Sequence, residues 1–451
     1  MPYLTKKYLT LTLFACLNTL LLTQCIKIDN TKPNPKTNDF DASVIVQWID
    51  LTNTLTQTTN GYTLPVATRA YAYMGIAAYE SVASGMPQNQ SMQGQLQGLN
   101  NLPSIDYNLT YHFGIIANEC LAQMAKALFE NAQTIHFLKI DSLKNKINAD
   151  LNTKLKDENT ANRSKLFGNA MGKALVVWLN TDGAATPWSN NYPNTYTPPL
   201  GEGLWKPTSN SQTRALQPFW GTQTRSFLAA NANINASQTP IAYSANNISP
   251  FYVQAFETYA IGKTLTSVQL TTAKYWANEP TQTPTLAGHF ATIARNLMAD
   301  KNEKLGNASE LFAKIGIGMH DATLAAWKNK FLYNVLRPQT YIQEKIDPTW
   351  LSALPAQPTP DYVSENACLA AAAAMALSDT YGYTTKFIDK THAARTDFDG
   401  SPRTYNAYTE AAAECALASL YAGTNYRFSN DNGLNEGYRV ARNILNLKWK
   451  K

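Results

Sequence analysis

Histidine and cysteine are scarce in this chain, with five residues of each among 451. Four of the histidines show no metal-ligand spacing: His112, His136, His289 and His392. The cysteines are odd in number and widely spaced: Cys16, Cys25, Cys120, Cys368 and Cys415. No HExxH, CxxC or phosphate-loop sequence is present either. The sequence therefore predicts no metal site and no disulfide framework.

Long apolar runs are also lacking, apart from one at the amino terminus. This run extends from Leu9 to Leu22, behind Lys6 and Lys7, and it is too short to span a bilayer comfortably. A basic start followed by a short apolar stretch is typical of an export signal. We therefore expect a cleavable signal peptide over residues 1–24.

The residues after this run predict an anchor. Leu-Thr-Gln-Cys, ending at Cys25, resembles a bacterial lipobox, which implies lipidation of Cys25. The stretch up to residue 40 is rich in Asn, Lys, Thr and Pro and favours a flexible tether over residues 25–40. We expect an outer-membrane lipoprotein at the cell surface or on the periplasmic face, with an envelope protein complex as a possible partner.

Excess charge is small for a chain of this length. The formal net charge of +6 falls by two, to +4, when a signal peptide carrying Lys6 and Lys7 is removed. The sequence has neither a dense basic stripe nor an aromatic readout motif. Nucleic acid is therefore not an expected partner.

Alternating strand patterns are scarce, and helical periodicity dominates. Apolar residues recur with helical spacing over residues 41–58, 66–84, 109–135, 139–180, 250–300, 308–336, 364–381, 404–422 and 433–448. The predicted fold is all-α, with an N-terminal helical lobe over 41–183 and a helical core over 249–451. Between them, residues 184–248 predict an irregular wrapping segment that packs Trp188, Trp205 and Trp220 against the helices.

Two cations and a helix breaker form the most informative motif. Lys330 and Arg337 are seven residues apart, which corresponds to two helical turns and about 10 Å along an axis. On one helix, both side chains would leave the same face and converge on one anion. Pro338 is expected to end that helix.

Two later segments complete a resemblance. They are Pro-Asp-Tyr-Val-Ser-Glu-Asn at residues 360–366 and Ser-Leu-Tyr-Ala-Gly-Thr-Asn-Tyr-Arg at residues 419–427. In order and spacing, the three segments resemble the type 2 phosphatidic acid phosphatase and vanadium haloperoxidase superfamily. Residues 41–86 are similar to the amino-terminal helices of bacterial haloperoxidase-like proteins. The resemblance implies a large helical bundle of that type.

The resemblance also assigns roles, and several of the required side chains are missing. Lys330, Arg337 and Ser364 match the oxyanion-binding positions. Glu365 occupies the place of a glycine and Asn366 that of a histidine. The third segment also departs from the superfamily pattern. Ser419 stands in place of an arginine, and Asn425 stands in place of the histidine that attacks phosphate or ligates vanadium.

These losses affect the chemistry directly. Asparagine neither ionises nor offers a usable nitrogen lone pair, whereas imidazole does both near neutral pH. Glu365 is expected to pair with Lys330 or Arg337 and neutralise the pocket, with Asn366 and Asn425 giving neutral hydrogen bonds. The sequence predicts no cofactor, and vanadate or phosphate only if the pocket is still competent.

We therefore expect a catalytically inactive haloperoxidase- or phosphatase-like lipoprotein that acts in binding or as a subunit of an envelope assembly. Two alternatives stay open. One is an active acid phosphatase or vanadium-dependent haloperoxidase with a rearranged site, for which His320 is the histidine nearest in sequence. The other is an oxyanion-binding protein. His320 and Asp321 are adjacent on a helix and point about 100° apart, which favours a packed histidine over a dyad.

Overall fold

The computed structural model describes residues 35–208, 212–228 and 239–451. The predicted signal peptide and Cys25 lie outside these residues. Pro35–Lys451 form one compact unit, and the boundaries expected within it, at residues 184 and 249, stay predictions. The end of the predicted tether packs on this unit, since the side chain of Thr37 is buried and donates to the carbonyl oxygen of Val82.

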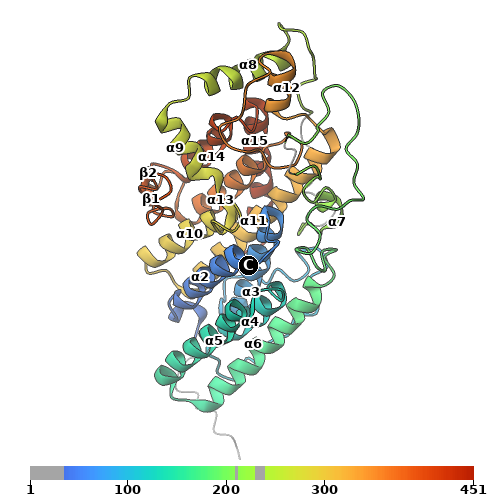
Figure 1. The fold of residues 1–451 in the computed structure, drawn as a ribbon. Coiled ribbons are helices and arrows are strands. Elements are labelled where there is room, and N and C mark those ends of the chain that lie inside the picture. Colours follow the sequence, from blue (N-terminus) through green and yellow to red (C-terminus); the bar gives the residue numbers. More distant parts are fainter. Residues whose placement is uncertain (1–34, 209–211, 229–238) are drawn as a thin grey trace, which may run out of the picture. The chain divides into compact units, whose positions relative to one another are not determined.

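The all-α prediction is confirmed (Figure 1). The helices of the first half are η1 (Thr37–Asp39), α2 (Ser43–Thr58), α3 (Leu64–Val82), η2 (Ala83–Gly85), α4 (Phe113–Leu128), α5 (Thr134–Leu155), α6 (Glu158–Leu179) and α7 (Trp220–Gln223). The second half contains α8 (Pro250–Lys263), α9 (Ser267–Ala277), α10 (Thr285–Asp300), α11 (Leu305–Tyr333), α12 (Pro338–Lys345), α13 (Glu365–Tyr381), α14 (Tyr408–Tyr421) and α15 (Arg427–Leu445).

Two of the predicted helical runs are divided. The run over residues 139–180 breaks at Lys156, which is left-handed with φ 54°, and Asp157 then caps α6 by accepting from the backbone N–H of Thr160. The run over residues 250–300 becomes α8, α9 and α10. A short antiparallel pair, β1 (Phe387–Asp389) with β2 (Arg403–Tyr405), was not expected, because three residues are too few to show alternation.

Helix α11 runs through the core and packs against α3 and α13. Glycines on both partners allow the close approach of α3 and α11. A Cβ atom on Gly75 would lie 2.5 Å from the carbonyl oxygen of Phe312, and one on Gly316 would lie 2.6 Å from that of Tyr71. Since real Cβ contacts are not so short, both positions need glycine, and α11 is thereby held at the centre of the fold.

The irregular segment packs its tryptophans as expected. Trp205 and Trp220 are buried, and Trp188 is half-buried against the core. The backbone N–H of Trp205 donates to the carbonyl oxygen of Asn334, which places this segment beside the end of α11. Over the part of the chain that the structure describes, no helix combines the length and the apolar character that a membrane span requires.

Candidate functional site

Lys330 and Arg337 are both buried, but they do not lie on one helix as the sequence predicted. Helix α11 ends at Tyr333, and Asn334 takes a left-handed conformation with φ 47°. Arg337 is the N-cap of α12, and Pro338 is its first residue. Asparagine tolerates the left-handed region, and proline is favoured at the first position of a helix. Pro338 therefore begins a helix rather than ending one.

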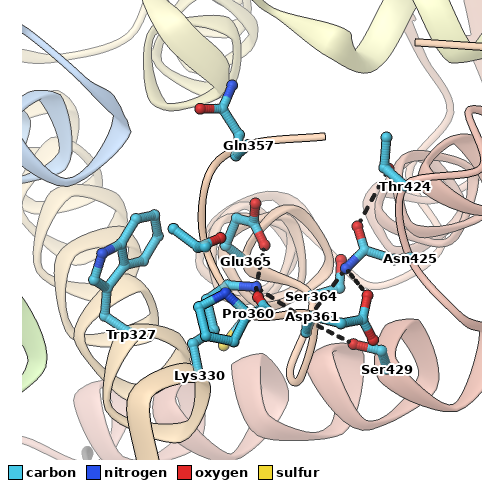
Figure 2. Close-up of polar contacts among 12 residues, drawn as sticks. Trp327, Lys330, Gln357, Pro360, Asp361, Ser364, Glu365, Thr424, Asn425 and Ser429 are labelled. Carbon is cyan, nitrogen blue, oxygen red and sulfur yellow. Dashed lines mark hydrogen bonds and ion pairs between the residues drawn. The ribbon is translucent and has the colours of Figure 1, made fainter. Parts of the chain in front are cut away.

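The ammonium group of Lys330 is surrounded by acceptors from the protein. Nζ donates to the carbonyl oxygens of Pro360 and Asp361 at 2.8 and 3.0 Å. It also forms an ion pair of 2.8 Å with Oε2 of Glu365 (Figure 2). An ammonium has three N–H donors, so these three acceptors match its capacity. Burial lowers the pKa of Lys330 to about 8, although the carboxylate of Glu365 opposes that shift.

The guanidinium group of Arg337 is directed at protein acceptors in the same way. Nε donates to the carbonyl oxygen of Thr359 at 2.8 Å, and Nη2 donates to the hydroxyl of the same residue at 2.8 Å. Nη1 donates to the carbonyl oxygen of Thr424 at 3.0 Å and lies 3.7 Å from Oδ1 of Asp361. The second cation of the motif is therefore held by the chain itself.

Two buried carboxylates accompany the two cations. The expected contact of Glu365 with one of the cations is present, through Lys330. Burial acts to raise the pKa of Glu365, but the charges of Lys330 and Arg337 outweigh it and hold that pKa below its ordinary value. Burial raises the pKa of Asp361 to about 7 against the same two cations. Asp361 belongs to the second sequence segment. Its contacts with the buried cations were not predicted, because the pattern used in the resemblance assigns no function to that position.

The two residues that flank Glu365 have different positions. Ser364 is the N-cap of α13, and its Oγ accepts from the backbone N–H of Ala367 at 3.5 Å. Asn366 borders the cavity described below. Its side chain forms no hydrogen bond with the residues that the structure describes, so the neutral contact expected of it is not made.

Asn425 does make the expected neutral contact. Its Nδ2 donates to Oδ1 of Asp361 at 2.8 Å. Gly423 permits the turn that brings Asn425 there, since it has φ 76° and a Cβ atom on it would lie 2.8 Å from Trp350. Ser419 borders the cavity, and its backbone carbonyl accepts from the N–H groups of Thr424 and Asn425.

A cavity of about 270 Å³ lies next to this cluster. Its polar walls include Asn278, Glu279, Gln357, Asn366, Ser419 and Asn425, and its apolar walls include Leu64, Tyr192, Leu216, Trp276, Leu286 and Trp327. Arg337 and Glu365 reach the cavity, whereas Lys330 and Ser364 are not among its lining residues. Glu365 therefore stands between the cavity and the buried lysine. The wrapping segment takes part in the site through Tyr192 and Leu216.

One wall, residues 278–285 between α9 and α10, was not singled out in the sequence because it carries no motif. Asn278, Thr281 and Thr285 have φ of 48°, 69° and 63°. Such values are uncommon for residues other than glycine, and for β-branched threonine they indicate strain. Asn278 is held by His289, whose Nε2 bonds Oδ2 of Asp389 at 2.7 Å and whose Nδ1 lies 3.1 Å from Nδ2 of Asn278.

The other histidines do not supply the missing imidazoles at the cluster. His320 is buried, and its Nε2 contacts the carbonyl oxygen of Arg225 at 3.1 Å. Burial lowers the pKa of His320 to about 4. Asp321 accepts from the hydroxyl of Ser226 and from the backbone N–H of Phe227. His320 is not a lining residue of the cavity.

These residues do not fit a tetrahedral oxyanion. Both cations direct their donors at carbonyl, hydroxyl or carboxylate oxygens of the chain, and Glu365 places a negative charge at the cradle. Across residues 35–208, 212–228 and 239–451, no group of three or more His, Cys, Asp or Glu side chains is arranged to hold a metal ion. The position that the resemblance assigns to a histidine carries Asn425.

The comparisons agree with this architecture. Residues 343–449 match the family described as the VCPO second helical-bundle domain. The fold is similar to that of the first bacterial vanadium-dependent iodoperoxidase, with TM-score 0.80, 24% identity, and coverage of 90% of this chain and 96% of that one. The chain has the vanadium haloperoxidase fold. No curated protein matches it in sequence.

Two further structures share the haloperoxidase fold at lower similarity. The apo form of a bacterial vanadium-dependent chloroperoxidase gives TM-score 0.62 at 14% identity, over 86% of this chain and 94% of that one. The holo form gives 0.63 at 15% identity, over 85% and 91%. The helical fold that the three segments implied is the fold that these structures share. At these identities the likeness concerns the fold, and what the site does has to be argued from its own residues.

Proposed function

We propose that this protein is a non-catalytic member of the haloperoxidase-like fold that uses its cavity to bind a ligand. The observation that carries the proposal is the ion pair between Lys330 and Glu365, at 2.8 Å within the buried cluster. A carboxylate of the chain is thus paired with the lysine that the resemblance assigns to an oxyanion. Arg337 supports the same conclusion, because its donors are engaged by Thr359 and Thr424.

The missing groups are the ones on which the chemistry depends. Phosphoryl transfer needs a nucleophile, a proton donor for the leaving group and cations for the equatorial oxygens. Vanadate-dependent oxidation needs an axial imidazole for the metal. Asn366 and Asn425 meet neither need, since an amide does not titrate and its nitrogen has no available lone pair. The neighbouring Ser419 carries no positive charge.

Turnover assays test the proposal. The purified chain is incubated with a phosphomonoester, and separately with orthovanadate, hydrogen peroxide and iodide or bromide. We expect rates equal to the buffer background in both assays. Lys330→Ala is the control for contamination. Turnover by the wild type that disappears in Lys330→Ala would contradict the proposal, whereas turnover that persists in the variant comes from another protein.

We further propose that the protein works at the cell envelope, anchored through a lipid on Cys25. The proposal rests on the lipobox-like sequence before Cys25 and on the apolar run that precedes it. Mass spectrometry of the mature amino terminus is the test. A lipidated Cys25 is expected, together with release into the soluble fraction in Cys25→Ser. An intact Met1, or cleavage beyond Cys25, would overturn it.

A further inference from the structure

The charged side chains that line the cavity do not balance. They are Arg337, Glu279 and Glu365. Arg337 is already bonded to carbonyl oxygens of the chain and to Thr359. The two carboxylates are on different walls, with Glu365 at the start of α13 and Glu279 just after α9. The charges that face the cavity without a full set of protein partners are therefore acidic. This differs from what an anion such as vanadate would require.

Each of the two carboxylates has capacity left for a ligand. Only Oε2 of Glu365 is used by Lys330, and the other oxygen points away from the lysine, toward the side of Gln357 (Figure 2). The side chain of Glu365 is 94% buried, and Lys330 is its one ion-pair partner among the described residues. The side chain of Glu279 forms neither a hydrogen bond nor an ion pair within the described parts of the chain. Burial raises the pKa of Glu279, and no cation opposes the shift.

Aromatic side chains border the same space. Trp276, Trp327 and Tyr192 are lining residues of the cavity. Trp276 is fixed in place, since one face stacks on His289 at 4.6 Å and its Nε1 donates to Glu414 at 2.9 Å. Trp327 is fixed by a hydrogen bond to the carbonyl oxygen of Leu216. Aromatic rings and a carboxylate without a counter-ion are the groups that recognise an ammonium ion in a partly desolvated site.

We propose that the cavity binds a small organic cation, with Glu279 as its principal counter-ion and the tryptophans as its apolar walls. This inference rests on the proposed function, because an oxyanion held by Lys330 and Arg337 would occupy the same place. The cation compensates the carboxylate of Glu279 and lies near the oxygen of Glu365 that does not contact Lys330. Asn366 and Ser419, which border the cavity, are placed to bond a polar group elsewhere on the ligand.

The test compares cations with neutral molecules of the same shape. Choline and 3,3-dimethylbutan-1-ol form one pair, and pentylammonium and pentan-1-ol form another. Binding to the purified full chain is followed by tryptophan fluorescence, because Trp276 and Trp327 line the cavity, and by calorimetry. We expect at least one cation to bind about tenfold more tightly than its neutral partner, as a charge-assisted contact is worth about 1.5 kcal/mol or more.

Variants of Glu279 test whether this residue causes the preference for a cation over its neutral analogue. Glu279→Gln is expected to abolish the preference for the cation, whereas Glu279→Asp, which keeps the charge, retains a preference. The matched control is Glu158→Gln, an exposed glutamate at the start of α6, which should bind like the wild type. Thermal unfolding of each variant shows whether it is folded, and Glu279→Asp keeps the test valid if the glutamine variant is not.

The outcomes separate this inference from the function on which it rests. Equal affinity for both members of each pair, or a preference unchanged in Glu279→Gln, would overturn the cation proposal. Failure of both cations to bind would overturn it too. These results leave the loss of catalysis untouched. Binding of orthovanadate that depends on Lys330 would instead overturn the proposed function, and the cation proposal would fall with it.

Discussion

The buried cluster next to the cavity and the cavity wall at residues 278–285 differ in how their polar groups are bonded. The cluster consists of Lys330, Arg337, Asp361 and Glu365 and is called the floor below. At the floor, Lys330 and Arg337 are buried and bonded to acceptors of the chain. At the wall, the side chain of Glu279 has no partner among the described residues, and Oδ1 of Asn278 and Oγ1 of Thr285 have none either. The cations of the floor are therefore paired within the chain, although Oδ2 of Asp361 has no hydrogen-bond partner there. The carboxylate of Glu279 at the wall has no such partner among the described residues.

The difference follows from the cost of burying a charge. An unpaired buried ion loses several kcal/mol of hydration, so the buried cations of the floor need a counter-charge. Glu365 meets that need next to Lys330. Glu279 is only partly buried, and water reduces the cost of leaving it unpaired. Mutations at the floor should therefore change stability, and mutations at the wall should change binding.

The largest effect is expected from Glu365→Gln. This change leaves the ammonium of Lys330 buried without a counter-charge, which should lower the free energy of unfolding by about 3–5 kcal/mol. Urea denaturation measures it. In the double variant Lys330→Met with Glu365→Gln, the loss should be smaller than the sum of the two single losses, because the unpaired charge is gone. Strict additivity would show that the pair does not hold the floor together.

A pH effect of on the order of 2 kcal/mol is expected from Asp361, since one pKa unit corresponds to about 1.4 kcal/mol. Its pKa rises from 3.8 to about 7 on folding. Its contribution to stability is therefore full below pH 3.8 and is lost as the pH rises through 7. Lys330, with a pKa lowered to about 8, acts in the opposite direction only between pH 8 and 10.5.

The measurement for Asp361 is the free energy of unfolding at pH 5 and at pH 8. The difference in unfolding free energy between the wild type and Asp361→Asn should decrease from pH 5 to pH 8. Asp397→Asn, at a carboxylate exposed to solvent and paired with Arg395, is the control and should show no such change. A difference between wild type and Asp361→Asn that is constant with pH would mean that Asp361 does not titrate in this window.

A smaller effect is expected where the wall is attached to the core. Asn278→Gly keeps the left-handed conformation but removes the amide that contacts His289, which should cost about 1 kcal/mol. Asn278→Ala should cost roughly 1 kcal/mol more, because a Cβ atom is unfavourable at positive φ. Thermal unfolding compares the two. Equal losses would indicate that backbone conformation does not matter at this position.

The smallest effect on stability is expected at Glu279. Glu279→Gln should change the free energy of unfolding by less than about 0.5 kcal/mol, because its side chain contacts no polar partner among the described residues. Urea denaturation beside Glu365→Gln gives the comparison directly. A loss similar to that of Glu365→Gln would remove the distinction between the floor and the wall.

The sequence predicted the floor better than the wall, for a physical reason. The three segments around Lys330, Ser364 and Asn425 are local patterns in a recognisable order, and the all-α fold follows from helical periodicity. Two details were wrong. The helix ends at Tyr333, because an isolated asparagine at 334 gives no clear signal of a helix end. The side chain of Asn366 borders the cavity and does not make the hydrogen bond expected of it.

The wall depends on contacts between distant parts of the chain. Glu279 comes to the cavity because α9 and α10 are joined by a strained loop, and His289 and Asp389 fix that loop from 100 residues apart. Tyr192 arrives from the irregular segment, which has no periodicity to interpret. Neither residue belongs to a motif, and periodicity carries no information on which loops meet.

The central claim is that Lys330 and Arg337 are satisfied by the chain and no longer bind an oxyanion. Calorimetric titration of orthovanadate into the purified wild-type protein, with Lys330→Ala beside it, tests this most directly. The account predicts no saturable binding to either protein at millimolar vanadate. Saturable binding of one vanadate per wild-type chain that is lost in Lys330→Ala would contradict it.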